Sequence, residues 1–196
     1  QGELRVEAGS TFAGLMTQTA GTTTVMGTFA GNIILQGGVL KGTGSITGNV
    51  SNSGGIFAPG TSPGTLTLQN YTQTAGGELV LEIDGDAPSQ RDHLIILGNA
   101  SFYGGRIVID LSEYAGTGAA SFADLLSVGG TLRLAHPVTG ASAVIDVIGL
   151  APGRSAQASW NGSTLGLSIA AAVPEPSAYA LMRAGLGLIG LARRRA

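Results

Sequence analysis

The chain of 196 residues has no cysteine, which excludes disulfide bonds, zinc fingers, iron–sulfur clusters and thiol catalysis. Aromatic residues make up 5% of the chain and charged residues 11%, so the core must consist mainly of aliphatic side chains. Lysine occurs once, as Lys41, and no Asp or Glu lies between residues 8 and 77. Residues 174–196 carry a net charge of +3, and because the whole chain carries −2, residues 1–173 carry −5. This acidic body lacks the clustered cations that nucleic acids require, so no nucleic-acid partner is expected.

Glycine, in contrast, is abundant, with 33 residues that follow no collagen-like period. Apolar residues make up 43% of the chain and the mean hydropathy is +0.31, which is enough for a folded body. Between Gly2 and Gly77, short runs of aliphatic or β-branched residues are separated by Gly, Asn and Ser. Such runs predict short β-strands. After about residue 78 the predicted strands are longer, and Ser121–Leu126 is predicted as a short helix.

Two kinds of repeat indicate how these strands are arranged. The sequence Thr-Gln-Thr-Ala-Gly occurs at Thr17–Gly21 and at Thr72–Gly76, 55 residues apart, which equals three windings of about 18 residues. Glycine pairs also recur, and they begin at Gly37, Gly54, Gly76 and Gly104. A parallel β-helix explains both repeats, because its corners favour Gly and Asn while its narrow interior accepts small and aliphatic side chains. We therefore predict an all-β fold in which residues 1–172 form one solenoid body, with less regular coils after about residue 78. The alternative is an antiparallel β-sandwich or meander.

Few residues of this body could carry out chemistry. Asp84, Asp86 and Asp92 form the only acidic cluster, and an exposed turn with solvated carboxylates is favoured there over a hard-cation site. His93 and His136 belong to no catalytic or metal-binding motif and are expected to be structural. No Asp or Glu lies between residues 8 and 77, which leaves the regular coils of that range without a general acid, so the body is expected to be non-enzymatic, without metal or other cofactor.

Three segments of the body resemble a known repeat. Leu40–Val50, Ala58–Leu68 and Asn70–Gln73 are similar to the passenger repeats of autotransporter-type exported bacterial proteins. In the second segment Pro59 and Pro63 fix φ at two corners, and a glycine follows each proline. The resemblance covers roughly residues 15–110 and implies that the β-helix is right-handed and parallel.

Three features follow one another at the C-terminus: a motif of Pro174, Glu175 and Pro176, an apolar run from Ala178 to Ala192, and a basic end of Arg193, Arg194 and Arg195. A helix over the apolar run would be about 22 Å long, shorter than the ~30 Å hydrocarbon core of a bilayer, and it contains Arg183. The terminal arginines suit a membrane stop on the cytoplasmic side. We predict that residues 173–196 form a separate unit with a short transmembrane helix.

This tail resembles the PEP-CTERM sorting signal of Gram-negative bacteria. The resemblance implies that an exosortase, a membrane transpeptidase-like cysteine enzyme, recognises Pro174–Pro176 and processes the chain nearby. It also implies a transient stay in the inner membrane, delivery to the cell surface or extracellular matrix, and association with exopolysaccharide and biofilm. We therefore expect an exported structural protein. The alternative is a carbohydrate-binding or carbohydrate-active β-helix that carries the same tail.

Overall fold

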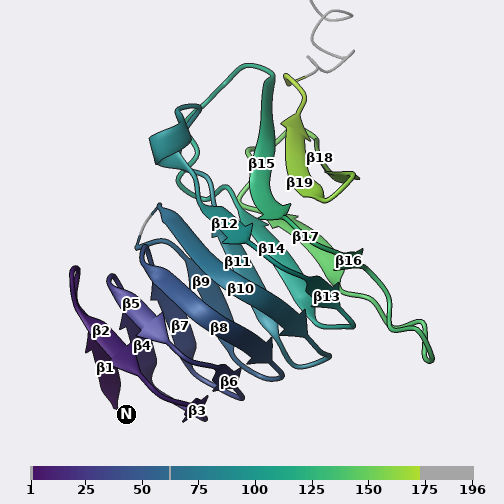
Figure 1. Ribbon diagram of the computed structural model, residues 1–196. Coiled ribbons are helices and arrows are strands. Elements are labelled where there is room, and N and C mark those ends of the chain that lie inside the picture. Colours follow the sequence, from purple (N-terminus) through teal and green to yellow (C-terminus); the bar gives the residue numbers. More distant parts are fainter. Residues whose placement is uncertain (1, 62, 173–196) are drawn as a thin grey trace, which may run out of the picture.

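The structure, a computed structural model, describes residues 2–61 and 63–172, which fold into two β-sheets (Figure 1). Sheet A contains, in spatial order, β1 (Glu3–Val6), β4 (Thr22–Val25), β7 (Val39–Gly42), β9 (Ile56–Pro59), β11 (Glu78–Glu82), β14 (Arg106–Asp110) and β17 (Val144–Ile148). Sheet B contains β2 (Thr11–Ala13), β5 (Thr28–Ala30), β8 (Ser45–Asn52), β10 (Thr65–Gln73), β12 (His93–Ile96), β15 (Ala120–Val128), β19 (Thr164–Ile169) and β18 (Ala156–Asn161). Four short strands extend sheet B along the chain direction: β3 (Met16–Gln18), β6 (Ile33–Leu35), β13 (Ala100–Phe102) and β16 (Leu132–Arg133). A 3₁₀ helix, η1 (Pro88–Gln90), follows β11.

The chain alternates between the two sheets. β1 in sheet A leads to β2 and β3 in sheet B, then β4 returns to sheet A, and the alternation continues as far as β17 (Figure 1). Neighbouring strands of sheet A are parallel throughout, and those of sheet B are parallel from β2 to β15. Parallel neighbours need a crossover connection, which strands of the opposite sheet supply here. The predicted all-β class is confirmed, and the antiparallel sandwich is the wrong alternative.

The Thr-Gln-Thr-Ala-Gly repeat falls at equivalent places in sheet B. Adjacent strands align Gln18, Leu35, Asn52 and Gln73 at neighbouring positions. The two copies of the repeat are therefore three windings apart, as their spacing predicts.

The glycine pairs lie at the corner that leads into sheet A. The φ angle is +75° at Gly38 and +74° at Gly105, a left-handed conformation that glycine adopts at little cost. A Cβ atom at Gly38 would lie 2.3 Å from the carbonyl oxygen of Gly21, and one at Gly105 would lie 2.0 Å from that of Gly77. Successive windings therefore approach too closely at this corner for any side chain, which explains the spacing of the pairs.

Aliphatic side chains and a short aromatic column fill the space between the sheets. One inward row of sheet A consists of residues that are at most 1% exposed: Leu40, Phe57, Leu79 and Ile107. Tyr71 lies between Phe57 and Phe102, with ring centroids 5.4 and 5.6 Å away. Trp160 packs on Phe102 with 5.9 Å between centroids, at the C-terminal end of the column.

Buried amide side chains support the corners from inside. Asn52 Oδ1 accepts a hydrogen bond from the Gly55 amide at 3.0 Å, and Asn52 Nδ2 donates to the Glu78 carbonyl at 3.0 Å. The Tyr71 hydroxyl donates to Gln73 Oε1 at 2.8 Å. An unpaired buried polar group costs about 1–3 kcal/mol, so these pairings hold the corners in one conformation.

An asparagine ladder joins the windings on the outside of sheet B. Asn32 Oδ1 accepts a hydrogen bond from the Asn49 amide at 2.8 Å, and Asn70 Nδ2 donates to Asn49 Oδ1 at 2.7 Å. Asn70 Oδ1 in turn accepts from the Asn99 amide at 2.6 Å. Asn32 separates β5 from β6, so the ladder stabilises sheet B where its strands are interrupted.

The windings lengthen toward the C-terminus. Sheet A aligns Thr22, Val39, Ile56, Glu78, Arg106 and Val144 at equivalent positions. The windings between them contain 17, 17, 22, 28 and 38 residues. The extra residues form η1 and the connections around β15 and β16.

The short helix predicted over Ser121–Leu126 is wrong. These residues belong to β15, which pairs in parallel with β12 and antiparallel with β19. Their Ala and Leu content favours a helix locally, but a strand between two partners satisfies the backbone on both edges. The strand also buries Phe122, Leu125 and Leu126, so tertiary packing overrides the local preference.

The antiparallel pair β18 and β19 ends the parallel stacking of sheet B. Within residues 2–61 and 63–172 there is no helix with the length and apolar character needed to cross a bilayer. The transmembrane helix predicted over Ala178–Ala192 lies outside the described residues.

Candidate functional site

The residues predicted to direct sorting lie outside the described part of the chain. They are Pro174, Glu175, Pro176, Arg193, Arg194 and Arg195, together with Arg183 in the apolar run. Any site whose geometry can be described therefore lies in the body, residues 2–61 and 63–172.

Asp92 departs most from its predicted environment. The sequence predicts an exposed turn at Asp92, but in the structure its side chain is buried, with 1% of the residue exposed. Its Oδ1 accepts a hydrogen bond from the Gly64 amide at 2.8 Å, and its Oδ2 accepts one from the Glu82 amide at 2.9 Å. Burial raises the pKa of Asp92 to about 7. The two hydrogen bonds from backbone amides favour the ionised form and lower the pKa, but the effect of burial is larger. Asp92 thus ties the loop at Gly64 to β11, a contact between residues 28 apart that the local sequence does not reveal.

Asp84 and Asp86 occupy environments different from that of Asp92. Asp86 is exposed, and its Oδ1 accepts a hydrogen bond from the Tyr114 hydroxyl at 2.7 Å. Asp84 lines a small depression with Glu82, whose pKa is raised by burial and by nearby carboxylates. In the described ranges no three His, Cys, Asp or Glu side chains gather as metal ligands. The three aspartates therefore do not act as one unit in this geometry.

Both histidines have partners within the body. His93 Nε2 lies 2.7 Å from Ser127 Oγ, and burial lowers the pKa of His93. The ring of His136 meets Tyr103 edge to face with 4.9 Å between centroids, and its Nδ1 accepts a hydrogen bond from the Val138 amide at 3.2 Å. These contacts are typical of structural histidines.

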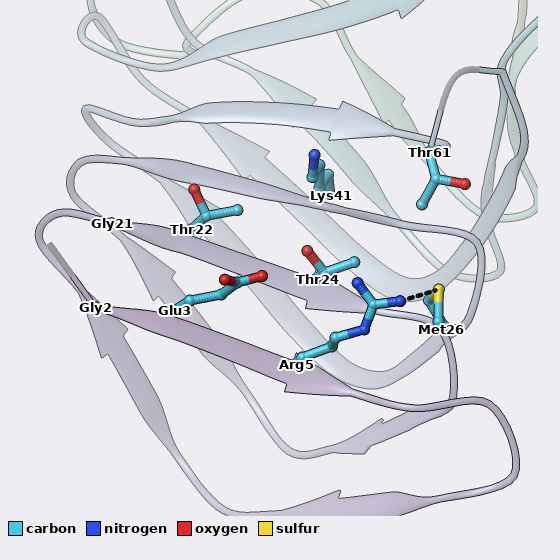
Figure 2. Close-up of a pocket in the computed structure, with 9 residues that line it drawn as sticks. All are labelled: Gly2, Glu3, Arg5, Gly21, Thr22, Thr24, Met26, Lys41 and Thr61. Atoms are coloured by element: carbon cyan, nitrogen blue, oxygen red, sulfur yellow. Dashed lines mark hydrogen bonds between the residues drawn. The ribbon is translucent and has the colours of Figure 1, made fainter.

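A depression of about 430 Å³ lies on the outer face of sheet A (Figure 2). Strand register aligns Arg5 on β1, Thr24 on β4 and Lys41 on β7. Neighbouring strands are ~4.8 Å apart, so the backbones that carry the two cations are about 10 Å apart, with Thr24 between them. Glu3 and Thr22 form the next row along the same strands. We call these five residues the Arg5–Lys41 groove.

The two cations of the groove keep hydrogen-bonding capacity. Arg5 Nε donates to Glu7 Oε1 at 2.6 Å and Arg5 Nη2 to Met26 Sδ at 3.7 Å. Among residues 2–61 and 63–172, the other three of its five guanidinium N–H groups have no hydrogen-bond acceptor. Within the part of the chain that the structure describes, Lys41 forms no ion pair. The groove therefore presents cationic donors above a small polar side chain.

No local sequence pattern predicts this groove. Arg5 and Lys41 lie far apart in the chain, and only the parallel register places them two strands apart on one face. The one sequence signal was that Lys41 is the single lysine and lies in a stretch without acids.

Comparison with known protein families gives a match at the C-terminus of the chain. Residues 172–196 match the family described as the PEP-CTERM protein-sorting motif. This match confirms the resemblance predicted from Pro174, Glu175 and Pro176. Among curated proteins, no match to the chain was found. The chain thus carries the sorting motif of an exported protein that passes the membrane and is processed by an exosortase.

Proposed function

We propose that this protein is a structural component of the cell surface or extracellular matrix of a Gram-negative bacterium. The observation that carries the proposal is the sorting motif at residues 172–196. An exosortase would recognise Pro174–Pro176 while the apolar run Ala178–Ala192 is held in the inner membrane. The basic end, Arg193–Arg195, would stop translocation and leave the body outside, in contact with exopolysaccharide and biofilm.

In this proposal residues 1–172 are a right-handed parallel β-helix and residues 173–196 are a separate sorting unit. The alternation of parallel strands between two sheets supports a solenoid body. Its windings are linked by backbone ladders, by the asparagine ladder and by a continuous core, so each winding stabilises the next. Such a body suits a passive, rigid component of a matrix.

The proposed body is not catalytic. Polysaccharide cleavage by a β-helix needs carboxylates that converge on one face. Of the three candidate aspartates, Asp86 and Asp92 have separate partners, and only Asp84 lines the depression that Glu82, Asp110 and Glu113 share. Turnover of a polysaccharide by the purified protein, abolished by alanine at Asp84, Asp86 or Asp92, would overturn this part of the proposal. A carbohydrate-binding role is the second candidate, because the Arg5–Lys41 groove offers unengaged polar groups on an open face.

A matched pair of tail variants tests the sorting role. Glu175→Ala removes the charge of the recognition motif and should leave the body folded but unprocessed and retained in the inner membrane. Arg183→Leu removes a charge within the apolar run, where insertion scales assign Arg a cost of about 2.5–3.5 kcal/mol, and should be processed at least as well as wild type. Cell fractionation and C-terminal peptide mapping distinguish the two outcomes. Export and processing of Glu175→Ala at the wild-type level would contradict the assigned motif.

A further inference from the structure

We infer that the Arg5–Lys41 groove binds carboxylate-bearing sugar units of an acidic polysaccharide. The inference deepens the proposed function, because it names the class of matrix polymer that the body contacts. The groove lies on the outer face of sheet A and spans the strands β1, β4 and β7 (Figure 2).

The side chain of Thr24 forms the floor of the groove. Thr24 is 3% exposed, and no hydrogen bond within residues 2–61 and 63–172 engages its side chain. Its neighbours in the row, Arg5 and Lys41, are both longer and rise on either side of it. The hydroxyl therefore lies between two cationic groups at the base of the depression.

This donor set matches a carboxylate. A carboxylate has two oxygens that accept about four hydrogen bonds, and the free N–H groups of Arg5 and the Lys41 ammonium can approach it from opposite sides. The Thr24 hydroxyl can donate from below. Each bond would be charge-assisted, and such bonds are roughly twice as strong as neutral ones.

The rest of the groove favours a sugar acid over a simple inorganic anion. Glu3 lies in the row beside the cations, together with Thr22. A carboxylate at this position repels a bare phosphate or sulfate, but it accepts hydrogen bonds from sugar hydroxyls. A uronate unit carries both the carboxylate that Arg5 and Lys41 can bind and the hydroxyls that Glu3 can bind.

Charges around the groove limit its affinity. Glu7 pairs with Arg5, and Glu82 interacts favourably with Lys41, so each cation has one partly compensating acid nearby. The body as a whole carries −5 and repels a polyanion at long range. Binding to one sugar unit should therefore be weak, and a polymer that places many units near the groove should bind measurably through its high local concentration.

The experiment uses the full chain in a nonionic detergent, with polygalacturonate and its fully methyl-esterified form as probes. The two polymers share a backbone and differ in the carboxylate charge. Affinity electrophoresis in the presence of a chelator should retard the protein in polygalacturonate and not in the esterified polymer. Lys41→Gln and Thr24→Val should each weaken the retardation, Lys41→Gln by about tenfold in apparent affinity because it removes a charge-assisted bond.

Arg106→Gln is the matched control. Arg106 also lies on sheet A, but outside the groove, where its Nε donates to Asp146 Oδ2 at 2.8 Å. The substitution Arg106→Gln changes the net charge by the same amount as Lys41→Gln. It should bind as wild type does. The inference is overturned if Arg106→Gln weakens binding as much as Lys41→Gln, or if the esterified polymer binds equally well. It is also overturned if neither polymer binds. A negative result of this kind leaves exosortase processing unaffected, so it can be told apart from failure of the proposed sorting function.

Discussion

Stability of the body should fall as the pH rises from about 4 to about 7, because of Asp92. Burial raises the pKa of Asp92 from its ordinary value of 3.8 to about 7 in the folded protein. Between these two values the folded chain binds a proton that the unfolded chain has lost, so the free energy of unfolding decreases with increasing pH. A pKa difference of this size lowers the free energy of unfolding by about 4 kcal/mol once Asp92 is ionised in both states. This value is an upper limit, because protein and water relax around the buried charge and stabilise it.

Asp92→Asn removes this pH dependence. Asparagine stays neutral at every pH, so the variant should lack the part of the slope that Asp92 supplies. It has its own cost of about 1–3 kcal/mol at low pH, because its Nδ2 would face an amide donor, either that of Gly64 or that of Glu82. The stability advantage of wild type over the variant should therefore be largest near pH 4, fall as the pH rises, and reverse toward pH 8, where the loss of up to about 4 kcal/mol exceeds the cost of the substitution.

Urea unfolding followed by the fluorescence of Trp160, the single tryptophan, measures this difference at each pH. Asp86→Asn serves as the control, since it removes an exposed carboxylate from the same loop and should leave the slope due to Asp92 in place. A difference between wild type and Asp92→Asn that stays constant from pH 4 to pH 8 would refute the assigned burial of the carboxylate.

Two further substitutions test the interior and the corners. Tyr71→Phe removes the hydroxyl that donates to Gln73 Oε1 and should lower the free energy of unfolding in urea by about 1–3 kcal/mol. The circular dichroism spectrum should show the β-sheets unchanged. An unchanged free energy of unfolding would mean that Gln73 does not need this hydrogen bond. Gly38→Ala forces a side chain into a left-handed position 2.3 Å from the Gly21 carbonyl oxygen and should cost about 3 kcal/mol or more. Gly118→Ala, where no atom lies within 4 Å, should change the thermal midpoint little, and equal losses from both glycine variants would contradict the close stacking of the windings.

The sequence alone revealed the features of the fold that repeat. Gln18 and Gln73 lie at equivalent positions three windings apart, as the spacing of their pentapeptides predicted. The glycine pairs such as Gly38 marked a corner because close packing of successive windings imposes the same requirement on each of them. Repetition makes such constraints visible in one sequence.

Features that depend on single long-range contacts could not be predicted. Asp92 looks like a loop carboxylate, and only the arrival of the Gly64 loop from an earlier winding buries it. Ser121–Leu126 has local helix preference, and only pairing with β12 and β19 makes it a strand. Arg5 and Lys41 meet on one face through strand register, which no local pattern records. The C-terminal tail, by contrast, was predictable because recognition by a processing enzyme depends on a short linear motif.

Mass spectrometry of the protein recovered from outside cells with an active exosortase tests the proposed route most directly. If the motif at residues 172–196 directs processing, the recovered chain should contain the body and lack its C-terminal Arg193–Ala196 segment. Recovery of the extracellular protein with an intact Arg193-Arg194-Arg195-Ala196 terminus would contradict it.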